Sequence, residues 1–369
     1  MTSTGRPLVG LELDGAGAHP AASVLSAETP ARALAPDRLA AAARAAEDAG
    51  FDVVWLAAAR PWDAAALAGG SGHGRLEPVE AAAFLAAVTT RVGLVAETTV
   101  AGAEPFHLAN RLASLDWAAQ GRAGWAPVWS TERHAPAGGS GSSERTEHQE
   151  VVDAVRALWD TWEDGVFLAD EATGRFLDLD RWHYADVRGE HVSVKGPSIT
   201  PRPPQGHLPV LGYGPGADLV RVGGADPSDA ASRADAARAA GARVVLDVEI
   251  LLDGDRPAAD RLAALDARAT WAPTGQLRLV GSPAAVAETL AGLAPHVDAI
   301  RLDPAVRAVD APLLATHVLP ALTPPGTRAA SSGGGSRLRD ALGLTPAQNR
   351  FTLAREGGAT TPTAGGRAA

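Results

Sequence analysis

The side chains that could do chemistry in this chain lie close to the ends of short apolar segments. His107 follows Glu104 at the start of a helix expected over residues 105–120, and a histidine there can transfer a proton near neutral pH. A structural role at the helix start is about as well supported. Glu97 and Thr99 lie two residues apart on the preceding strand, so both point to the same face. Glu97 is therefore either a general base in a pocket or a carboxylate in solvent at its mouth.

The next apolar segment, residues 122–129, carries two tryptophans. Trp125 and Trp129 alternate with smaller residues, a pattern typical of core layers and of cavity walls. We interpret Trp125 as a core residue. Trp129 and Ser130 come at the C-terminal end of the strand, so we expect them to face a cavity.

Several other kinds of chemistry are excluded. The chain has no cysteine, which excludes disulfides, thiolate metal sites and cysteine nucleophiles. Its 10 histidines show no HExxH or other ligand spacing, so no metal site is predicted. The glycine-rich run at 212–216 follows a strand, but Pro215 lacks an amide donor and no helix follows at the right place. This argues against a dinucleotide-binding loop.

The composition argues against nucleic acids and membranes as binding partners. There are 33 Lys and Arg residues against 43 Asp and Glu residues, a net charge of -10, so the basic surface of a nucleic-acid or anionic-membrane binder is not expected. Residues 1–10 lack the features of a signal peptide, and no apolar run reaches the roughly 18 residues of a membrane span. We expect a cytoplasmic protein with no membrane and no nucleic-acid partner.

Strand-like and helix-like segments alternate along the chain, which is the pattern of a parallel α/β fold. Eight strands in this arrangement predict a TIM (β/α)8 barrel, whose active-site loops follow the C-terminal ends of the strands. The eight strands are expected at residues 7–13, 51–56, 92–95, 122–129, 209–213, 217–222, 242–252 and 298–302.

One connection in this barrel is too short for a helix. Only three residues separate strand five, which ends near Tyr213, from strand six, which begins near Ala217. Parallel neighbours ordinarily need a crossover of about a dozen residues. The sequence therefore predicts that one helix of the barrel is missing between strands five and six.

The chain is expected to divide into four parts. Residues 1–328 form the barrel, including a long excursion after the fourth helix, at 163–206, which we expect to roof the site. A Ser/Gly linker at 329–336 leads to a docking segment at 337–353, and residues 354–369 form a disordered tail.

Five strings spread over most of the chain resemble the luciferase-like flavin-dependent monooxygenases, in the branch with the nitrilotriacetate, dibenzothiophene-sulfone and long-chain-alkane monooxygenases. They are EPFHLANRLASLDWAAQGRAGW, VVDAVRALWDTWEDG, RGEHVSVKGPSITPRPPQG, GSPAAVAETL and LRDALGLTPAQNRF. The resemblance implies a barrel that receives reduced FMN from a separate NAD(P)H:flavin reductase and uses O2 to oxygenate a small organic substrate. It also implies a homodimer or homotetramer.

The resemblance implies which positions of this chain would contact a flavin, and at several of them the residue type differs from that of the relatives. Ala58 stands where relatives have an aspartate at the flavin ring, and Thr146 stands where relatives have a tyrosine that touches the phosphate. Relatives carry a Gly-Ser turn and a helix N-terminus for the phosphate after strand five, where this chain has its short connection. The implied flavin-binding positions are Ala58, Thr99, Trp129, Ser130, Thr146, Gly212, Tyr213 and Gly214.

These departures leave alternatives open. The first is an FMN-dependent two-component monooxygenase with His107 and Glu97 as catalytic residues, in which Glu97 could instead repel an anionic flavin. The second is a flavin-poor relative that serves as a partner subunit or binds a small apolar ligand. A third is a protein that uses a different flavin, such as deazaflavin.

Overall fold

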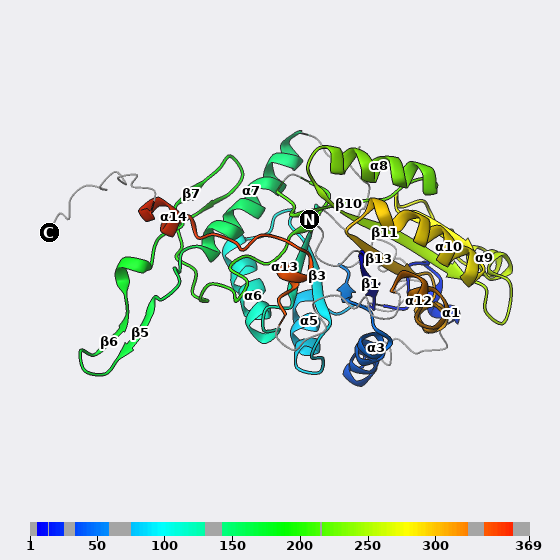
Figure 1. Ribbon diagram of the computed structural model, residues 1–369, viewed down its shortest axis with the longest axis horizontal. Helices are drawn as coiled ribbons and strands as arrows, with labels where there is room; N and C mark the ends of the chain where they lie inside the picture. Colours follow the sequence, from blue (N-terminus) through cyan, green and yellow to red (C-terminus); the bar gives the residue numbers. More distant parts are fainter. Residues whose placement is uncertain are drawn as a thin grey trace.

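A parallel sheet surrounded by helices forms the body of the protein (Figure 1). The structure, a computed structural model, describes residues 6–13, 15–25, 34–58, 75–129, 142–214, 216–323 and 336–356. Ser130, nearly all of the expected linker and most of the expected tail lie outside the described residues.

Eight parallel strands form the wall of the barrel. In spatial order they are β4 (Ala123–Val128), β3 (Gly93–Thr99), β2 (Val53–Leu56), β1 (Leu8–Glu12), β13 (Ala299–Pro304), β11 (Arg243–Leu252), β10 (Leu219–Val222) and β9 (Leu211–Gly212). A parallel bridge between Trp125 and Val210 brings the two ends of this sheet together. The predicted TIM barrel is therefore confirmed. A further strand, β12 (Leu277–Gly281), pairs with the second half of β11 and was not predicted.

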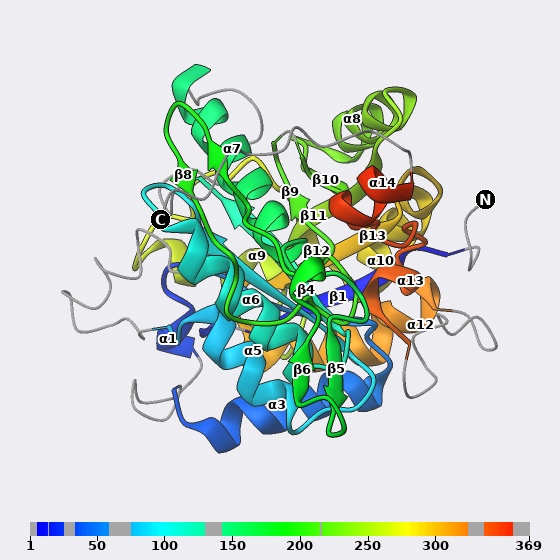
Figure 2. The same ribbon diagram turned by 90° about the vertical axis from the view of Figure 1, so that its left-hand side faces the viewer.

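The helices follow the strands and cover the outside of the barrel (Figure 2). Four of the longer helices begin with both a proline in the first turn and a side-chain cap, as expected from the missing proline N–H and the free amides there. The longer helices are α3 (Pro36–Ala49), α5 (Pro78–Ala86), α6 (Pro105–Ala118), α7 (Ser142–Trp159), α8 (Pro227–Ala239), α9 (Ala258–Asp266), α10 (Pro283–Leu293) and α11 (Arg307–Leu313). In the part of the chain that the structure describes, no helix has both the length and the apolar character to cross a bilayer.

The missing helix between strands five and six is confirmed. Residues 213–218 connect β9 directly to β10, and only Pro215 of this turn lies outside the described residues. Such a short connection is possible because the pairing is short: Leu211 and Gly212 pair with Leu219 and Val220. The Asp218 carboxylate accepts a hydrogen bond from the Val210 amide at 2.8 Å, which closes the turn.

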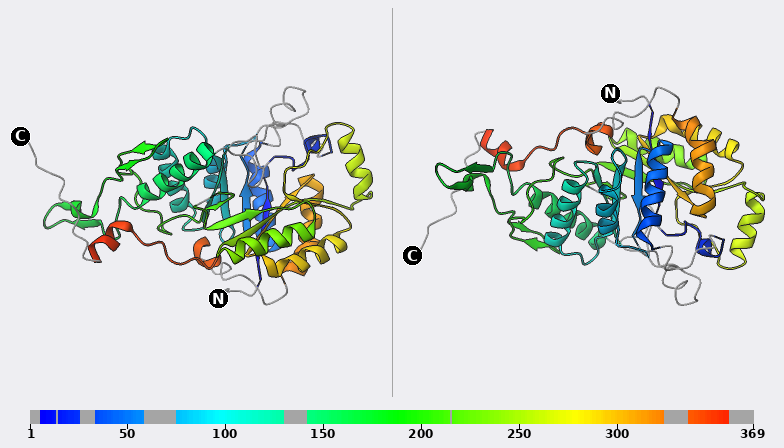
Figure 3. Two further views of the ribbon diagram at one scale, coloured as in Figure 1. Left: turned by 90° about the horizontal axis from the view of Figure 1, so that it is seen from above. Right: turned by 90° about the horizontal axis from the view of Figure 1, so that it is seen from below.

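The excursion after the fourth helix is also present. It contains two small hairpins, β5 (Phe167–Asp170) with β6 (Arg175–Leu177), and β7 (Val187–Arg188) with β8 (Ser193–Val194). The first hairpin extends away from the barrel, at the end of the molecule opposite α9 (Figure 3). The segment α14 (Arg350–Glu356) lies next to this excursion, where the Arg355 guanidinium contacts Glu163 at 2.6 Å.

The barrel interior has an apolar floor. Alternate residues of each strand point inward, and near the N-terminal ends of the strands these residues are apolar. The short helix α13 (Leu338–Ala341) closes this end. The buried cluster that it joins contains Leu8, Val53, Trp55, Val95, Leu211, Leu219, Val245 and Ala299. The division of the chain into the four predicted parts stays a prediction.

Candidate functional site

A cavity of about 490 Å³ lies where β2 and β3 end and where α5 and α6 begin. Loops at the C-terminal ends of the strands are the usual site of function in this architecture. The cavity brings together four residues that the sequence singled out, namely Ala58, Glu97, Thr99 and His107. No residue of the excursion at 163–206 is part of its lining, so the expectation that this segment roofs the site is wrong for this cavity.

Two glutamates at the rim fix the starts of the two helices. Glu77 accepts hydrogen bonds from the amides of Val79 at 2.8 Å and Glu80 at 3.3 Å. Glu104 accepts one from the amide of His107 at 2.8 Å. Burial, followed by the neighbouring Glu80, raises the pKa of Glu77. The His107 residue itself is exposed at the rim, so its ring is open to solvent.

Glu97 lies inside the barrel and is fully buried. Its Oε2 is 2.8 Å from Nη1 of Arg221 on β10, and its Oε1 accepts a hydrogen bond from the amide of Ala58 at 3.3 Å. The alternative of a solvated carboxylate is therefore wrong. A carboxylate is expensive to bury without a cationic partner, and Arg221 is that partner.

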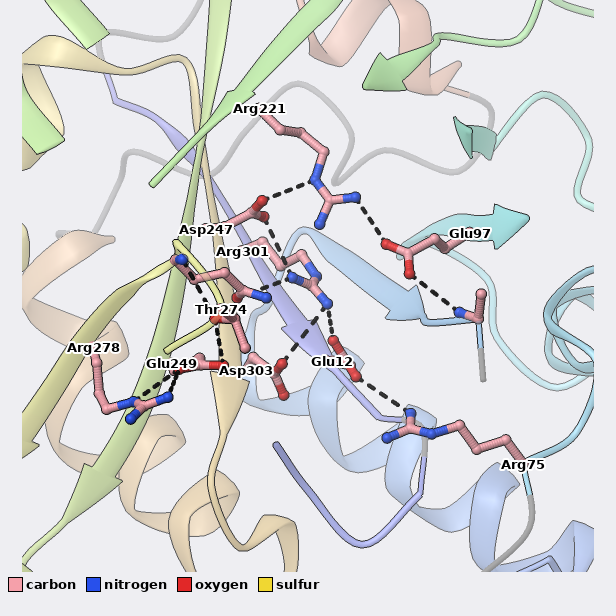
Figure 4. Close-up of polar contacts among 12 residues, drawn as sticks. Glu12, Arg75, Glu97, Arg221, Asp247, Glu249, Thr274, Arg278, Arg301 and Asp303 are labelled. Atoms are coloured by element: carbon pink, nitrogen blue, oxygen red, sulfur yellow. Dashed lines mark hydrogen bonds and ion pairs between the residues drawn. The ribbon is translucent and has the colours of Figure 1, made fainter. Parts of the chain in front are cut away.

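The ion pair of Glu97 is part of a larger network inside the barrel (Figure 4). The Arg221 Nε is 2.9 Å from Oδ2 of Asp247, which also accepts a hydrogen bond of 2.5 Å from the Tyr213 hydroxyl. The Asp247 Oδ1 is 3.4 Å from Nη1 of Arg301. Burial alone would lower the pKa of Arg221, but the carboxylates of Asp247 and Glu97 raise it above its usual value. Burial raises the pKa of Tyr213 well above its usual value, which keeps its hydroxyl protonated as a donor.

A second arm of the network, from Arg301 through Glu12 to Arg75, also leads to the cavity. Arg301 contacts Glu12 on β1, and Glu12 lies 3.5 Å from Arg75. Both Arg75 and Glu97 line the cavity, so the two ends of this alternating row of charges meet there. Arg301 is also 3.8 Å from Asp303. Trp55 lies against the row, with the guanidinium carbons of Arg221 and Arg301 at 5.4 Å and 5.6 Å from its ring centre.

Most members of this network were missed by the sequence analysis. They are Glu12, Arg221, Asp247, Arg301 and Asp303. The pattern that could have found them is the period of two within strands, because Arg221, Asp247 and Arg301 each lie two positions after an apolar residue of the barrel floor.

Comparison with known proteins places the chain in a family. Residues 17–294 match the family described as luciferase-like monooxygenase. The chain belongs to this family. It is 40% identical over 195 residues to one of the subunits of pristinamycin IIA synthase from Streptomyces pristinaespiralis, covering 52% of this chain and 63% of that protein. It is 39% identical over 155 residues to nitrilotriacetate monooxygenase component A of Aminobacter aminovorans, covering 39% and 34%. The chain thus matches between about a third and under two thirds of the length of these curated relatives.

Solved structures show the same fold at low sequence identity. Riboflavin lyase, solved with a modified FMN and riboflavin, has a TM-score of 0.76 and 21% identity, covering 92% of this chain and 96% of that one. Long-chain alkane monooxygenase has a TM-score of 0.74 and 17% identity, covering 93% and 96%. At this level of identity the comparisons concern the barrel fold.

The turn expected to face the phosphate of a flavin does not fit that group. No helix begins among the described residues between β9 and β10, so they offer none of the free amides and dipole that hold a phosphate at a helix N-terminus. The space beside Gly214 is filled, because a Cβ on it would lie 3.3 Å from Cδ2 of the buried His148 ring. Gly212 is buried in β9, and the Tyr213 hydroxyl is engaged by Asp247.

The remaining predicted positions lie apart from the cavity. Thr146 is exposed on α7, and Trp129 is partly buried after β4, with its carbonyl accepting a hydrogen bond from the Ala101 amide at 3.2 Å. Neither residue lines the cavity. Within the described residues, no group of three His, Asp or Glu side chains is arranged to hold a metal ion. The flavin-binding and catalytic roles of the predicted residues stay predictions.

Proposed function

We propose that this chain is a subunit of a two-component flavin-dependent monooxygenase that uses O2 to oxygenate a small organic molecule. Family membership supports the class of reaction. The observation that carries the proposal is the cavity, because it joins four positions assigned from the sequence to chemistry or to the flavin. A separate NAD(P)H:flavin reductase is the proposed source of reduced FMN.

The chain's own residues have distinct parts in this proposal. His107 lies at the rim, where it can exchange a proton between a bound molecule and solvent. Glu97 presents a carboxylate whose position is fixed by Arg221 and by the Ala58 amide. Thr99 adds a hydroxyl to the same wall. Assembly as a homodimer or homotetramer and a cytoplasmic location stay predictions.

A second candidate function is that of a flavin-poor partner subunit or small-ligand binding protein. It is favoured by the turn between β9 and β10, whose described residues contain no helix and in which Gly214 packs against His148. The similarity to one subunit of pristinamycin IIA synthase also supports a role as one subunit of an assembly.

Titration of the purified full chain with oxidised and reduced FMN, followed by calorimetry or flavin fluorescence, separates these candidates. Micromolar binding supports the monooxygenase. If neither form binds up to about 1 mM, the contacts contribute less than roughly 4 kcal/mol, and the partner-subunit function is the better account.

A further inference from the structure

The two helix N-termini at the cavity are not available to an anion. A free helix N-terminus is a ready site for phosphate because its first amides lack partners. In α5 and α6 the carboxylates of Glu77 and Glu104 accept hydrogen bonds from amides of the first turn. Each N-terminus therefore already has its own negatively charged group.

The arginines of the cavity are also engaged. Arg75 lies 3.5 Å from Glu12 in the barrel network. Arg111 lies between two carboxylates, with Nη2 at 2.6 Å from both Glu77 and Glu80. A guanidinium that is paired in this way offers little net positive charge to a ligand phosphate.

One carboxylate of the described lining remains outside these ion pairs. Glu77 is paired with Arg111 and Glu97 with Arg221, whereas no guanidinium among the described residues contacts Glu104 at the rim. An incoming dianion would meet like charge at the rim, whereas an uncharged molecule would meet none of this repulsion. The turn between β9 and β10 is no substitute for a phosphate site, since His148 packs against it.

We infer that this cavity selects an uncharged organic ligand, and that the phosphate of a flavin weakens binding there. The inference rests on the proposed function, because it concerns the ligand of the same cavity. It names the chemical class: a neutral ring or chain compound, which a phosphate-free flavin such as riboflavin represents.

The test compares riboflavin with FMN on the purified full chain, by quenching of flavin fluorescence at low and high salt. At about 0.01 M salt, where charges act over roughly 30 Å, riboflavin should bind at least about threefold more tightly than FMN. At about 1 M salt, where that range falls to roughly 3 Å, the difference should largely disappear.

A variant that removes one lining carboxylate tests whether the repulsion of FMN arises at this cavity. Glu104→Gln removes one lining carboxylate but keeps an oxygen to accept the His107 amide, so FMN affinity at low salt should rise about two- to fivefold while riboflavin affinity stays the same. Glu288→Gln, exposed on α10, removes the same charge away from the cavity and should change neither.

The outcomes are distinct. Tighter binding of FMN than of riboflavin at low salt overturns the inference and leaves the proposed monooxygenase standing. Absence of binding of either flavin up to about 1 mM overturns both, since it removes the flavin from this cavity altogether.

Discussion

Glu97 on β3 and Arg221 on β10 form an ion pair across the barrel interior, with 2.8 Å between Oε2 and Nη1. The two strands are not neighbours in the sheet, because β4 and β9 lie between them on the nearer side. Both side chains are buried, and Arg221 also binds Asp247 on β11. Arg221 thus links three strands: it is a cationic partner of Glu97, and it shares Asp247 with Arg301.

Removal of this guanidinium should be strongly destabilising. Arg221→Met leaves the carboxylates of Glu97 and Asp247 buried with one fewer cation, so the free energy of unfolding should fall by about 3–5 kcal/mol. Urea denaturation at pH 7 measures the change. The double variant Glu97→Gln with Arg221→Met should recover part of the loss, because one unpaired charge is gone.

An exposed pair supplies the control. Arg233 on α8 contacts Asp229 one turn earlier at 2.9 Å, and Arg233→Met should cost no more than about 0.5 kcal/mol. Equal losses in Arg221→Met and Arg233→Met would contradict the role assigned to the buried network.

The sequence predicted the barrel and its missing helix because both depend on local information. Alternation of strands and helices sets the fold class, and the length of the connection after Tyr213 sets the missing helix. The environment of Glu97 could not be predicted, because its partner Arg221 lies 124 positions away. A charged residue in a strand looks the same in sequence whether it faces solvent or a buried countercharge. The interior network is therefore visible only in the folded structure, where the strands lie side by side.

The sequence also could not predict that the excursion at 163–206 lies away from the cavity. Its length alone suggested a lid, but its direction depends on contacts with distant residues. One such contact is that of Ser198, whose hydroxyl donates to the Asn110 side chain on α6 at 2.9 Å. This contact holds the later part of the excursion against α6, while its first hairpin extends away from the barrel.

Restoring a helix after Tyr213 should create a phosphate site. Insertion of a Gly-Ser-Ser turn and a helix of about ten residues between Tyr213 and Gly214 should raise FMN affinity by up to about tenfold, through free amides and the helix dipole. Riboflavin is the control ligand, because it lacks the phosphate and its affinity should not change. No gain for FMN would mean that its phosphate does not come near this turn.

The position of the Trp55 indole beside the network requires a glycine at position 10. A Cβ on Gly10 would lie 2.5 Å from Nε1 of Trp55, so Gly10→Ala must displace the indole from its place beside Arg221 and Arg301. Overpacking of this kind should cost about 1–3 kcal/mol in urea denaturation. Gly292→Ala on α10 is the matched control, since its Cβ meets nothing within 4 Å and should stabilise by about 0.5–1 kcal/mol. Equal effects of the two substitutions would show that the indole moves without cost.

A buried carboxyl on α6 should make stability depend on pH. Asp116 is fully buried, and burial raises its pKa to about 6 although Gln205 donates two hydrogen bonds to it, from its side chain at 2.7 Å and its backbone at 3.2 Å. The native pKa lies above the unfolded value of about 3.9, so the native state binds the proton more tightly. Its contribution to stability is present below pH 4 and is lost as the pH rises through about 6.

The change amounts to about 3 kcal/mol, because each pKa unit corresponds to about 1.4 kcal/mol. In Asp116→Asn this position cannot titrate. Between pH 4 and pH 7 the free energy of unfolding of the unsubstituted chain should therefore fall relative to that of the variant. Asp37→Asn, exposed in the first turn of α3, should keep the full pH dependence. A constant difference between the native chain and Asp116→Asn over this range would show that Asp116 has an ordinary pKa, because only a carboxyl that ionises differently in the two states links folding to pH.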